Sequence, residues 1–298
     1  MEKRRFILDT DIGPDCDDCG ALAILDRACA DGKAELLGVT HCTSDLLSVD
    51  VIAAINDWFG VVTPIGQTER KGFFEDATKY TKPVSESYRA KLAETGKKAP
   101  ETEKPVPLLR RLLAGNTGIT FVLIGPLGNL ADLLTSEPDE ISPLDGVSLV
   151  KKAVDKVVIM GGNFKDTERP EFNIECDIPA ARIVAGKCPA PIVWCGFEAS
   201  LDVITGETLK DCPEDYPVRL AYEKYTDESF RRPSWDLATV LYALTPDSED
   251  WIVSDERKVD FADNGAVIIS DGKGSRWVRH RDERALEKTL NGIIGLSD

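Results

Sequence analysis

The chain has 298 residues, 42% of them hydrophobic, and a formal net charge of −16 from 52 acidic and 36 basic side chains. This length and composition are enough for a sizeable core, so we expect a globular protein rather than a disordered one. The negative charge disfavours a sequence-independent grip on nucleic acid or on anionic membranes and suits a cation ligand better.

The first residues are basic, but they reach Asp9 before an export signal of useful length could form, and no apolar run extends over 18 residues. We therefore expect a cytoplasmic protein that has neither nucleic acid nor a membrane as a partner. The eight cysteines fit a reducing compartment, because a core of this size does not need disulfides. Cys16 and Cys19 form a CxxC pair, but no second pair follows at zinc spacing, so a structural zinc site is not expected.

Short apolar runs alternate with helical patterns along the chain, which is typical of βαβ units. The predicted fold class is α/β: a single domain over residues 1–298 with a mostly parallel, open and doubly wound central sheet flanked by helices. The expected strands are 5–9, 35–40, 119–124, 154–160 and 191–195. The expected helices are 18–31, 46–59, 106–115, 127–136 and 178–186.

Two further segments stand apart from this alternation. Residues 66–105 are charged and interrupted by prolines, which indicates an excursion or a lid over the sheet. Near the C-terminus, Asn264-Gly265 lies between two strand-like runs and predicts a hairpin turn.

Polar groups follow four of the expected strands at the point where each strand ends. An aspartate-rich segment, 9–18, follows the first strand, and the runs GPLGN, GGNF and GFE follow strands 119–124, 154–160 and 191–195. Ligands of open α/β sheets bind at the carboxyl ends of the strands. The four groups therefore predict one site at one edge of the sheet.

The aspartate-rich segment is the strongest chemical signal in the chain. It contains five aspartates within ten residues, namely Asp9, Asp11, Asp15, Asp17 and Asp18. Capping of the following helix would explain one or two of them. Carboxylates this close together repel and raise one another's pKa unless a cation lies between them. A hard divalent ion resolves the repulsion, and Ca²⁺ tolerates irregular loop geometry better than Mg²⁺ does.

Three kinds of metal-dependent site use a cluster of acids of this type. An EF-hand needs a bidentate acid at the twelfth loop position, which is Gly20 when the count starts at Asp9, so this interpretation fails. A Mg²⁺-dependent DxD phosphotransferase, with Asp9 as nucleophile and Asp11 as acid and base, is allowed but leaves Asp17 and Asp18 without a role. The third is a glycoside-type hydrolase whose cation holds sugar hydroxyls and the attacking water.

Several blocks follow one another from residue 6 to about 245: DTDIGPDCDD, AAINDWFG with PIG, IGPLGNLADLL, VVIMGGNF, EFNIECDIPAARIV, PIVWCGFE and SWDLATVLYAL. In this order, the blocks together resemble the inosine-uridine-preferring nucleoside hydrolase family. The first block is a longer variant, with two more residues between Asp11 and the Asp17-Asp18 pair than the commonest form. The resemblance implies Ca²⁺-dependent hydrolysis of the N-glycosidic bond of ribonucleosides by a homo-oligomer, either a dimer or a tetramer.

The resemblance also implies roles for individual residues. Ca²⁺ would be held by the side chains of Asp11, Asp18 and Asp236 and by the main-chain carbonyl of Ile124. Asp11 would also be the general base for the attacking water, and Asp9 would support the ligands from the strand end. The expected substrate-binding residues are Asp17, Asn163, Glu171, Asn173 and Trp235.

Two positions depart from the family pattern. Trp235 stands where better-known members have the histidine that protonates the leaving base, and indole cannot act as a general acid at neutral pH. Stacking on Trp235, water, or a side chain such as Tyr80 would then have to assist departure of the base, and His41 is the one histidine placed for catalysis. Asp45 stands where the family commonly has asparagine, and we expect it to cap the helix beginning at Leu46.

No role is assigned to Asp15, which lies in the lengthened part of the loop. Because the family histidine is missing, a ribose- or nucleoside-binding protein without turnover also remains open as an interpretation.

Overall fold

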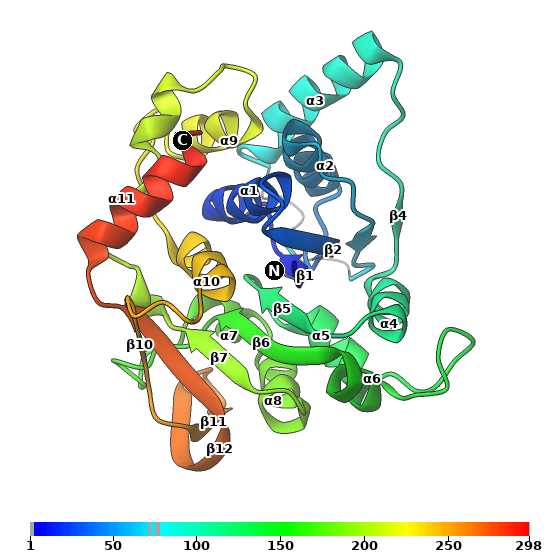
Figure 1. Ribbon diagram of the computed structural model, residues 1–298, viewed down its shortest axis with the longest axis vertical. Helices are drawn as coiled ribbons and strands as arrows, with labels where there is room; N and C mark the ends of the chain where they lie inside the picture. Colours follow the sequence, from blue (N-terminus) through cyan, green and yellow to red (C-terminus); the bar gives the residue numbers. More distant parts are fainter. Residues whose placement is uncertain (1–2, 71–72, 75–77, 298) are drawn as a thin grey trace.

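The computed structural model describes residues 3–70, 73–74 and 78–297. Its centre is a ten-stranded sheet in the order β10-β12-β7-β6-β5-β1-β2-β3-β4, with β11 paired to β12 (Figure 1). All neighbours from β12 to β4 are parallel, whereas β10 and β11 run antiparallel to β12. The predicted class, a single α/β domain with a mostly parallel sheet, is confirmed.

The strands of this sheet are β1 (Arg4–Thr10), β2 (Ala34–His41), β3 (Ile65–Gln67), β4 (Thr102–Glu103), β5 (Ile119–Leu123), β6 (Val154–Met160), β7 (Ile192–Cys195), β10 (Trp251–Val253), β11 (Arg257–Phe261) and β12 (Val267–His280). A separate antiparallel pair is formed by β8 (Ile204–Thr205) and β9 (Arg232–Pro233). The five strands and five helices expected from the sequence are all present, with ends that differ by at most two residues.

The helices are α1 (Asp17–Ala30), α2 (Leu47–Phe59), α3 (Thr81–Thr95), α4 (Pro105–Gly115), α5 (Gly128–Leu134), α6 (Gly146–Ala153), α7 (Phe172–Cys176), α8 (Ile178–Lys187), α9 (Pro217–Tyr225), α10 (Trp235–Leu244) and α11 (Glu283–Ile294). Two 3₁₀ turns, η1 (Phe197–Ala199) and η2 (Glu207–Asp211), complete the fold.

Helices cover both faces of the sheet because consecutive residues of each central strand point to opposite sides. In β1, Phe6 and Leu8 belong to the apolar cluster shared with α1, α2, α3, α9, α10 and α11, whereas Ile7 belongs to the cluster shared with α4, α5, α6 and α8. All three side chains are fully buried. The central strands are therefore apolar on both sides, as the continuous apolar runs predicted.

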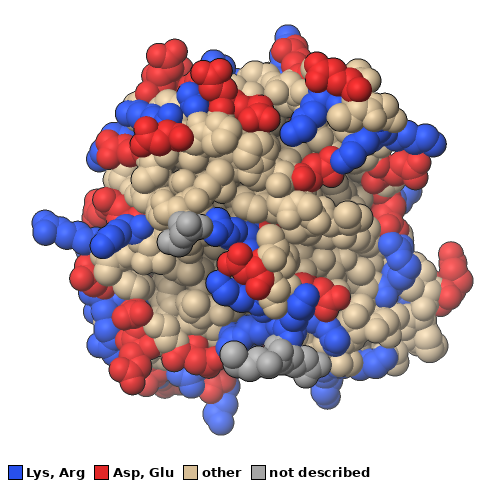
Figure 2. All heavy atoms as spheres, turned by 45° about the horizontal axis from the view of Figure 1, so that its top comes forward, with Lys and Arg blue, Asp and Glu red and all other residues tan. Residues whose placement is uncertain are grey.

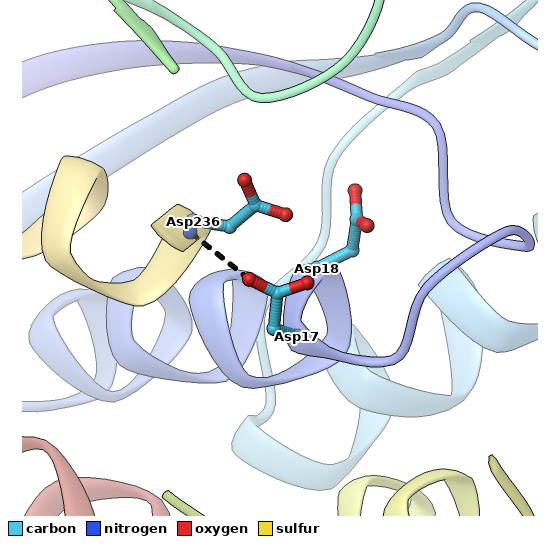
Figure 3. Close-up of side chains that lie close together, drawn as sticks. All are labelled: Asp17, Asp18 and Asp236. Carbon is cyan, nitrogen blue, oxygen red and sulfur yellow. Dashed lines mark hydrogen bonds between the residues drawn. The ribbon is translucent and has the colours of Figure 1, made fainter. Parts of the chain in front are cut away.

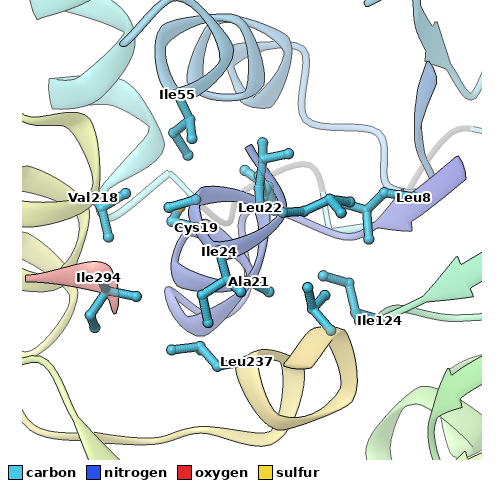
Figure 4. Packing of buried hydrophobic residues seen from close by; sticks show 14 of the residues in the cluster. Leu8, Cys19, Ala21, Leu22, Ile24, Ile55, Ile124, Val218, Leu237 and Ile294 are labelled. Carbon is cyan, nitrogen blue, oxygen red and sulfur yellow. The ribbon is translucent and has the colours of Figure 1, made fainter. Parts of the chain in front are cut away.

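Helix α1 is surrounded by other helices rather than lying at the surface (Figure 4). Leu22 and Ile24 of α1 are buried among residues of neighbouring elements that include Ile55 of α2, Val218 of α9 and Leu237 of α10. A helix buried on most sides holds its first residues in a fixed place. The aspartates at the start of α1 are therefore fixed relative to the sheet.

The carboxyl ends of the central strands lie side by side. Asp9 at the end of β1 pairs in register with Thr40 of β2 and with Leu123 of β5, and Met160 of β6 pairs with Cys195 of β7. The segments that follow these strands therefore meet at one edge of the sheet, which is where the sequence predicted a site.

Residues 66–105 add strands β3 and β4 to the sheet and helix α3 to its face. The described side chains Tyr80, Val84 and Leu92 are buried in the cluster that includes α2 and α9. Part of the predicted lid segment, residues 71–72 and 75–77, lies outside the described residues. A lid function for the remainder stays a prediction.

The hairpin predicted at Asn264-Gly265 is present between β11 and β12. The main-chain amide of Ala262 donates to the carbonyl of Ala266 at 2.8 Å, and Gly265 has a φ of 84°, which favours glycine.

On the surface shown in Figure 2, acidic and basic side chains are interspersed, and no large basic patch stands out on that face. No helix in the described part of the chain is long and apolar enough to cross a membrane.

Candidate active site

A pocket of about 310 Å³ lies at the carboxyl edge of the sheet, between the ends of β5 and β6 and the starts of α1 and α10. Six acidic residues line it: Asp11, Asp15, Asp17, Asp18, Glu171 and Asp236. Four aromatic residues line it as well: Phe172, Phe197, Tyr225 and Trp235. The other described lining residues are Pro14, Ile124, Met160, Asn173 and Arg232. The pocket thus combines a dense acidic part with an aromatic wall.

The acidic part is formed where two helices begin. Asp17 and Asp18 are the first residues of α1, and Asp236 is the second residue of α10. Their three carboxylates point towards a common space (Figure 3), and each offers one oxygen within 4.8 Å of the others. The main-chain amide of Asp236 donates to Oδ2 of Asp17 at 3.1 Å, which fixes the two helix starts relative to each other. All three carboxylates are buried.

Asp11 lies beside this group, in the turn that follows β1. Its carboxylate packs against Gly125, where an added Cβ would come within 2.7 Å of Oδ1 of Asp11, so the approach requires glycine. The Asp11 and Asp18 carboxyls interact directly, and Asp18 also accepts a 2.5 Å hydrogen bond from Oγ1 of Thr10. The three carboxylates to which the resemblance gives a metal-binding role, those of Asp11, Asp18 and Asp236, thus line one pocket.

Burial and mutual repulsion determine the protonation of these four acids. Burial raises the pKa of Asp11, Asp17 and Asp236 well above the usual range, and the repulsion of neighbouring carboxylates raises it further. Burial raises the pKa of Asp18 to about 7, against the opposing effect of the Thr10 hydrogen bond. Without a compensating cation, the protein cannot keep all four groups ionised at neutral pH.

These four acids fit a hard divalent cation. They offer closely spaced, buried carboxylate oxygens, which are the ligands that Ca²⁺ and Mg²⁺ prefer. Ile124 also lines the pocket. Its main-chain oxygen accepts a hydrogen bond from Nδ2 of Asn173 at 3.4 Å. Asp17 belongs to the group of three acids whose oxygens lie closest together, and Asp11 does not. The resemblance implies instead that Asp11 is a metal ligand and that Asp17 binds ribose.

Glu171 and Asn173 lie at the start of the short helix α7. Glu171 caps it: its carboxylate accepts from the main-chain amides of Asn173 at 2.9 Å, Gly162 at 3.1 Å and Ile174 at 3.3 Å. Burial raises the pKa of Glu171 to about 7 in spite of these hydrogen bonds. Since a carboxylate has about four acceptor positions, one position remains for a ligand hydroxyl.

Asn163 is the one predicted substrate-binding residue that is not among the described lining residues. Its Oδ1 accepts from the main-chain amide of Asp166 at 2.8 Å, which closes the turn that follows β6. A role for Asn163 in substrate binding stays a prediction.

Asp9 is fully buried behind the pocket and does not line it. Its Oδ1 accepts from Nδ2 of Asn129 at 2.7 Å and from the hydroxyl of Thr40, and burial raises its pKa to about 7. A nucleophile must reach its substrate, so this placement gives no support to phosphoryl transfer through Asp9.

The aromatic wall is built around Trp235, the first residue of α10. Its indole Nε1 donates to the main-chain oxygen of Phe197 at 2.9 Å, and the two rings stack with centroids 5.5 Å apart. The guanidinium carbon of Arg232 lies 5.3 Å from the centroid of Trp235 and 5.3 Å from that of Tyr225. The wall therefore offers flat surfaces of the kind on which a planar base can stack.

Arg232 and Asp15 are the charged lining residues to which sequence reasoning gave no role. Asp15 had no assigned role, but it forms a bidentate ion pair with Arg232. Both residues line the pocket. The two residues are 217 positions apart, so no local pattern joins them. The extra length of the aspartate-rich loop was the available signal, because an insertion there must contact something new.

Two side chains considered for assisting departure of the base are placed elsewhere. His41 is fully buried, its ring nitrogens lie 2.9 Å from Oε1 of Gln67 and 2.9 Å from the main-chain oxygen of Ile12, and burial lowers its pKa. Tyr80 is also fully buried, and its hydroxyl donates to the main-chain oxygen of Asp15 at 2.6 Å. Neither lines the pocket, so their positions give no support to a direct role of either side chain in departure of the base.

Asp45 has a structural position. Its Oδ1 accepts from the main-chain amide of Leu47 at 2.9 Å, and its Oδ2 accepts from the hydroxyls of Ser48 at 3.1 Å and Thr81 at 2.8 Å. These contacts hold the start of α2, which begins at Leu47, as the capping interpretation expected.

The fold and the pocket define an open α/β protein with an oxygen-rich site for a small polar ligand at the carboxyl edge of its sheet. The sequence profile of a family described as inosine-uridine preferring nucleoside hydrolase matches residues 6–288. This chain therefore belongs to that nucleoside hydrolase family, which confirms the resemblance and the expectation of an enzyme.

Individual relatives agree with the family. The chain is 27% identical over 235 residues to the pyrimidine-specific ribonucleoside hydrolase RihB of Escherichia coli strain SE11, and the match covers 74% of this chain and 66% of RihB. It is 28% identical over 185 residues to the non-specific ribonucleoside hydrolase RihC of Escherichia coli strain SMS-3-5, over 57% of each chain. The matches thus span two thirds or less of each relative.

Among solved structures, the inosine-uridine preferring nucleoside hydrolase of Bacillus anthracis superposes with a TM-score of 0.73 at 16% identity, covering 99% of each chain. At this identity the likeness shows a shared fold.

Proposed function

We propose that this protein hydrolyses the N-glycosidic bond of ribonucleosides, releasing ribose and the free base, with one Ca²⁺ as cofactor. The observation that carries the proposal is the group of four buried carboxylates, Asp11, Asp17, Asp18 and Asp236, beside an aromatic wall in one pocket. A ribose has hydroxyls for the acidic part, and a base has a flat face for the wall. The family and its named relatives support the same activity.

The cation would be held by Asp11, Asp18, Asp236 and the main-chain oxygen of Ile124. When bound, it would neutralise these acids and polarise the oxygens of the sugar and of the attacking water. Calcium is proposed over magnesium because the ligands come from a loop and two helix starts, an irregular set that Ca²⁺ accommodates more readily.

The protein's own groups divide the remaining work. Asp11 takes the proton of the attacking water, and Asp17 binds a ribose hydroxyl through Oδ1, since its Oδ2 already accepts from Asp236. Asn173 and Glu171 hold the rest of the sugar from α7. Cleavage of an N-ribosyl bond passes through a cationic sugar, which nearby carboxylates stabilise.

The direct test is release of free ribose from uridine, cytidine, inosine, adenosine and guanosine by the purified protein. We expect ribose release that EDTA abolishes and added Ca²⁺ restores. Asp11→Asn should lower turnover at least about 10²-fold, whereas Asp202→Asn, at an exposed position, should not change it. Unchanged hydrolysis after complete metal removal would contradict the cation, and nucleoside binding without ribose release would instead favour a binding protein.

We further propose that the protein acts in the cytoplasm on free nucleosides and assembles as a dimer or tetramer. Eight cysteines without disulfides support a reducing compartment. Light scattering on a sizing column measures the assembly, and a monomeric mass would contradict it.

A further inference from the structure

Arg232 is the one cationic side chain among the described residues that line the pocket. Its guanidinium lies between the rings of Tyr225 and Trp235, at 5.3 Å from each centroid. Rings placed in this way both favour the cation and fix the plane of the guanidinium. Arg232 is therefore an ordered part of the pocket.

Asp15 fixes Arg232 from one edge. Nε of Arg232 donates to Oδ1 of Asp15 at 2.9 Å and to Oδ2 at 3.0 Å, and Nη2 also donates to Oδ2. Nη1 makes no hydrogen bond with any described residue, so the donors on that side of the guanidinium remain for a ligand.

Asp15 is itself held in place. Its Oδ1 accepts from the main-chain amide of Cys16 at 2.7 Å, and its main-chain oxygen accepts from the hydroxyl of Tyr80 at 2.6 Å. The same hydroxyl accepts from the main-chain amide of Gly13 at 2.7 Å. The lengthened loop is thus held by Tyr80 at the start of α3. Because this contact fixes Asp15, it also fixes the ion pair of Asp15 with Arg232.

The position of Arg232 corresponds to the base end of a bound nucleoside. Trp235 and Asp236 are consecutive at the start of α10, so the aromatic wall begins where the acidic part ends. A ribose held by the acids directs the base towards Trp235, and the guanidinium that lies over this ring is then within reach of the rim of the base. The indole N–H of Trp235 already donates to the main-chain oxygen of Phe197, so Trp235 has no donor left for a hydrogen bond to the base.

We propose that Arg232, positioned by Asp15, is a catalytic residue that donates hydrogen bonds to the departing base and selects bases with an oxo group. This inference rests on the proposed nucleoside hydrolysis. Because a guanidinium only donates, it suits the carbonyl oxygens of uracil and hypoxanthine and gives nothing to the amino group of adenine. Asp15 is a positioning residue, since it acts through Arg232.

The bond changes balance without a proton from Arg232. The bond between C1′ and the base nitrogen breaks, and its electron pair leaves with the base, where it spreads onto the oxo group. Arg232 stabilises that negative charge. The oxygen of water bonds to C1′, its proton goes to Asp11, and solvent then protonates the base anion and takes the proton from Asp11. The sum is nucleoside plus water giving ribose plus base.

A comparison of leaving groups tests this role. Uridine and inosine need stabilisation of the departing anion, whereas 4-nitrophenyl riboside releases a phenolate that is stable by itself. For Arg232→Met we expect kcat/KM to fall about 100-fold on uridine and inosine and to stay within about threefold on the nitrophenyl substrate. For Asp15→Asn we expect the same pattern with a smaller loss. The uridine-to-adenosine preference of the wild-type protein should shrink in both variants.

Arg231→Met is the matched control, because Arg231 is the adjacent arginine and pairs with the exposed Glu207 outside the pocket. It should leave both substrates unchanged. Retained cleavage of the nitrophenyl riboside also shows that each variant is folded. Equal losses on both substrates in Arg232→Met, or a wild-type preference for adenosine, would overturn the role of Arg232. Failure of the wild-type protein to cleave any of these substrates would instead overturn the proposed function.

Discussion

The main-chain amide of Asp236 donates a 3.1 Å hydrogen bond to Oδ2 of Asp17, joining residues 219 positions apart. The contact connects the start of α10 to the start of α1, and both starts contribute acids to the pocket. Amides at a helix start carry partial positive charge and favour a nearby carboxylate. One hydrogen bond and the partial charges of two helix starts do not offset the mutual repulsion of four buried carboxylates. Without a cation, these acids should therefore lower the stability of the folded protein.

Removal of one of these charges should stabilise the protein when no metal is present. In Asp18→Asn the side chain keeps its shape and can still accept from Thr10, but the repulsion with Asp11 and Asp17 disappears. We expect thermal unfolding in EDTA at pH 7.5 to shift upward by several degrees, which corresponds to about 1 kcal/mol or more. Hydrolysis should be lost in the same variant.

Calcium should stabilise the wild-type protein and have little effect on Asp18→Asn. Added Ca²⁺ should raise the unfolding temperature of the wild-type protein, because a ligand that binds only the folded state stabilises it. It should barely change that of Asp18→Asn, while Asp202→Asn should behave as wild type. An equal calcium-induced shift in all three proteins would place the binding site away from Asp18.

Tyr80 should support the loop without taking part in departure of the base. In Tyr80→Phe the main-chain amide of Gly13 loses its buried acceptor, so the free energy of unfolding should fall by about 1–3 kcal/mol. Because Asp15 also loses its brace, and Asp15 positions Arg232, uridine cleavage should slow more than cleavage of 4-nitrophenyl riboside, with a smaller loss than in Asp15→Asn. Tyr88→Phe, whose hydroxyl lies 3.1 Å from Asp57 away from the pocket, is the control. Equal losses on uridine and on 4-nitrophenyl riboside would show that the brace from Tyr80 does not act through Arg232.

The strands and helices around the site were predictable because their signals are local. An apolar run of this length, such as residues 154–160, is typical of a central strand of a parallel sheet, and it forms β6 over that range. The aspartates of the first motif could be placed at the sheet edge because they directly follow β1. Local pattern and topology together were enough for these residues.

The pair of Asp15 and Arg232 was not predictable in the same way. Each residue on its own looks like an ordinary charged position in a loop, and the ion pair exists only because α10 packs against α1. The position of Tyr80 was not predictable for a related reason. Its segment was expected over the pocket, but Tyr80 is fully buried at the start of α3, which packs against α2. Contacts between distant segments depend on how the helices are arranged, and short sequence blocks do not specify that arrangement.

Arg110 should be among the costliest side chains to remove outside the site. It is 1% exposed, and its guanidinium donates to both carboxylate oxygens of Asp139, to Oγ of Ser136 and to the main-chain oxygens of Ser142 and Leu144. Arg110→Met removes all of these hydrogen bonds at a buried position, although Asp139 and the Ser142 oxygen keep main-chain donors, so we expect a loss of about 2–3 kcal/mol in urea unfolding. The neighbouring Arg111→Met removes only an exposed pair with Glu103 and should cost less than about 1 kcal/mol. Similar losses for the two variants would show that the buried network contributes little.

Asp26 should make the protein less stable as pH rises. It is fully buried in α1, neither carboxylate oxygen has a hydrogen-bond partner among the described residues, and burial raises its pKa well above 3.8. Above pH 3.8 the unfolded chain ionises Asp26 while the folded protein keeps it protonated, so unfolding releases a proton and higher pH favours unfolding. Stability due to this group is complete below pH 3.8 and is lost as pH climbs towards the folded pKa.

The variant Asp26→Asn isolates this effect from the other buried acids, which change stability with pH in both proteins. Within the window where only the unfolded Asp26 is ionised, one released proton corresponds to about 1.4 kcal/mol per pH unit. The free energy of unfolding in urea, measured from pH 5 to pH 8, should therefore fall less steeply in Asp26→Asn than in the wild-type protein. Asp31→Asn, at a half-exposed position of an ion pair with Lys33, should not flatten the wild-type slope. Parallel curves for the wild-type protein and Asp26→Asn would mean that Asp26 ionises in the folded state as readily as in the unfolded chain, which its burial without a partner argues against.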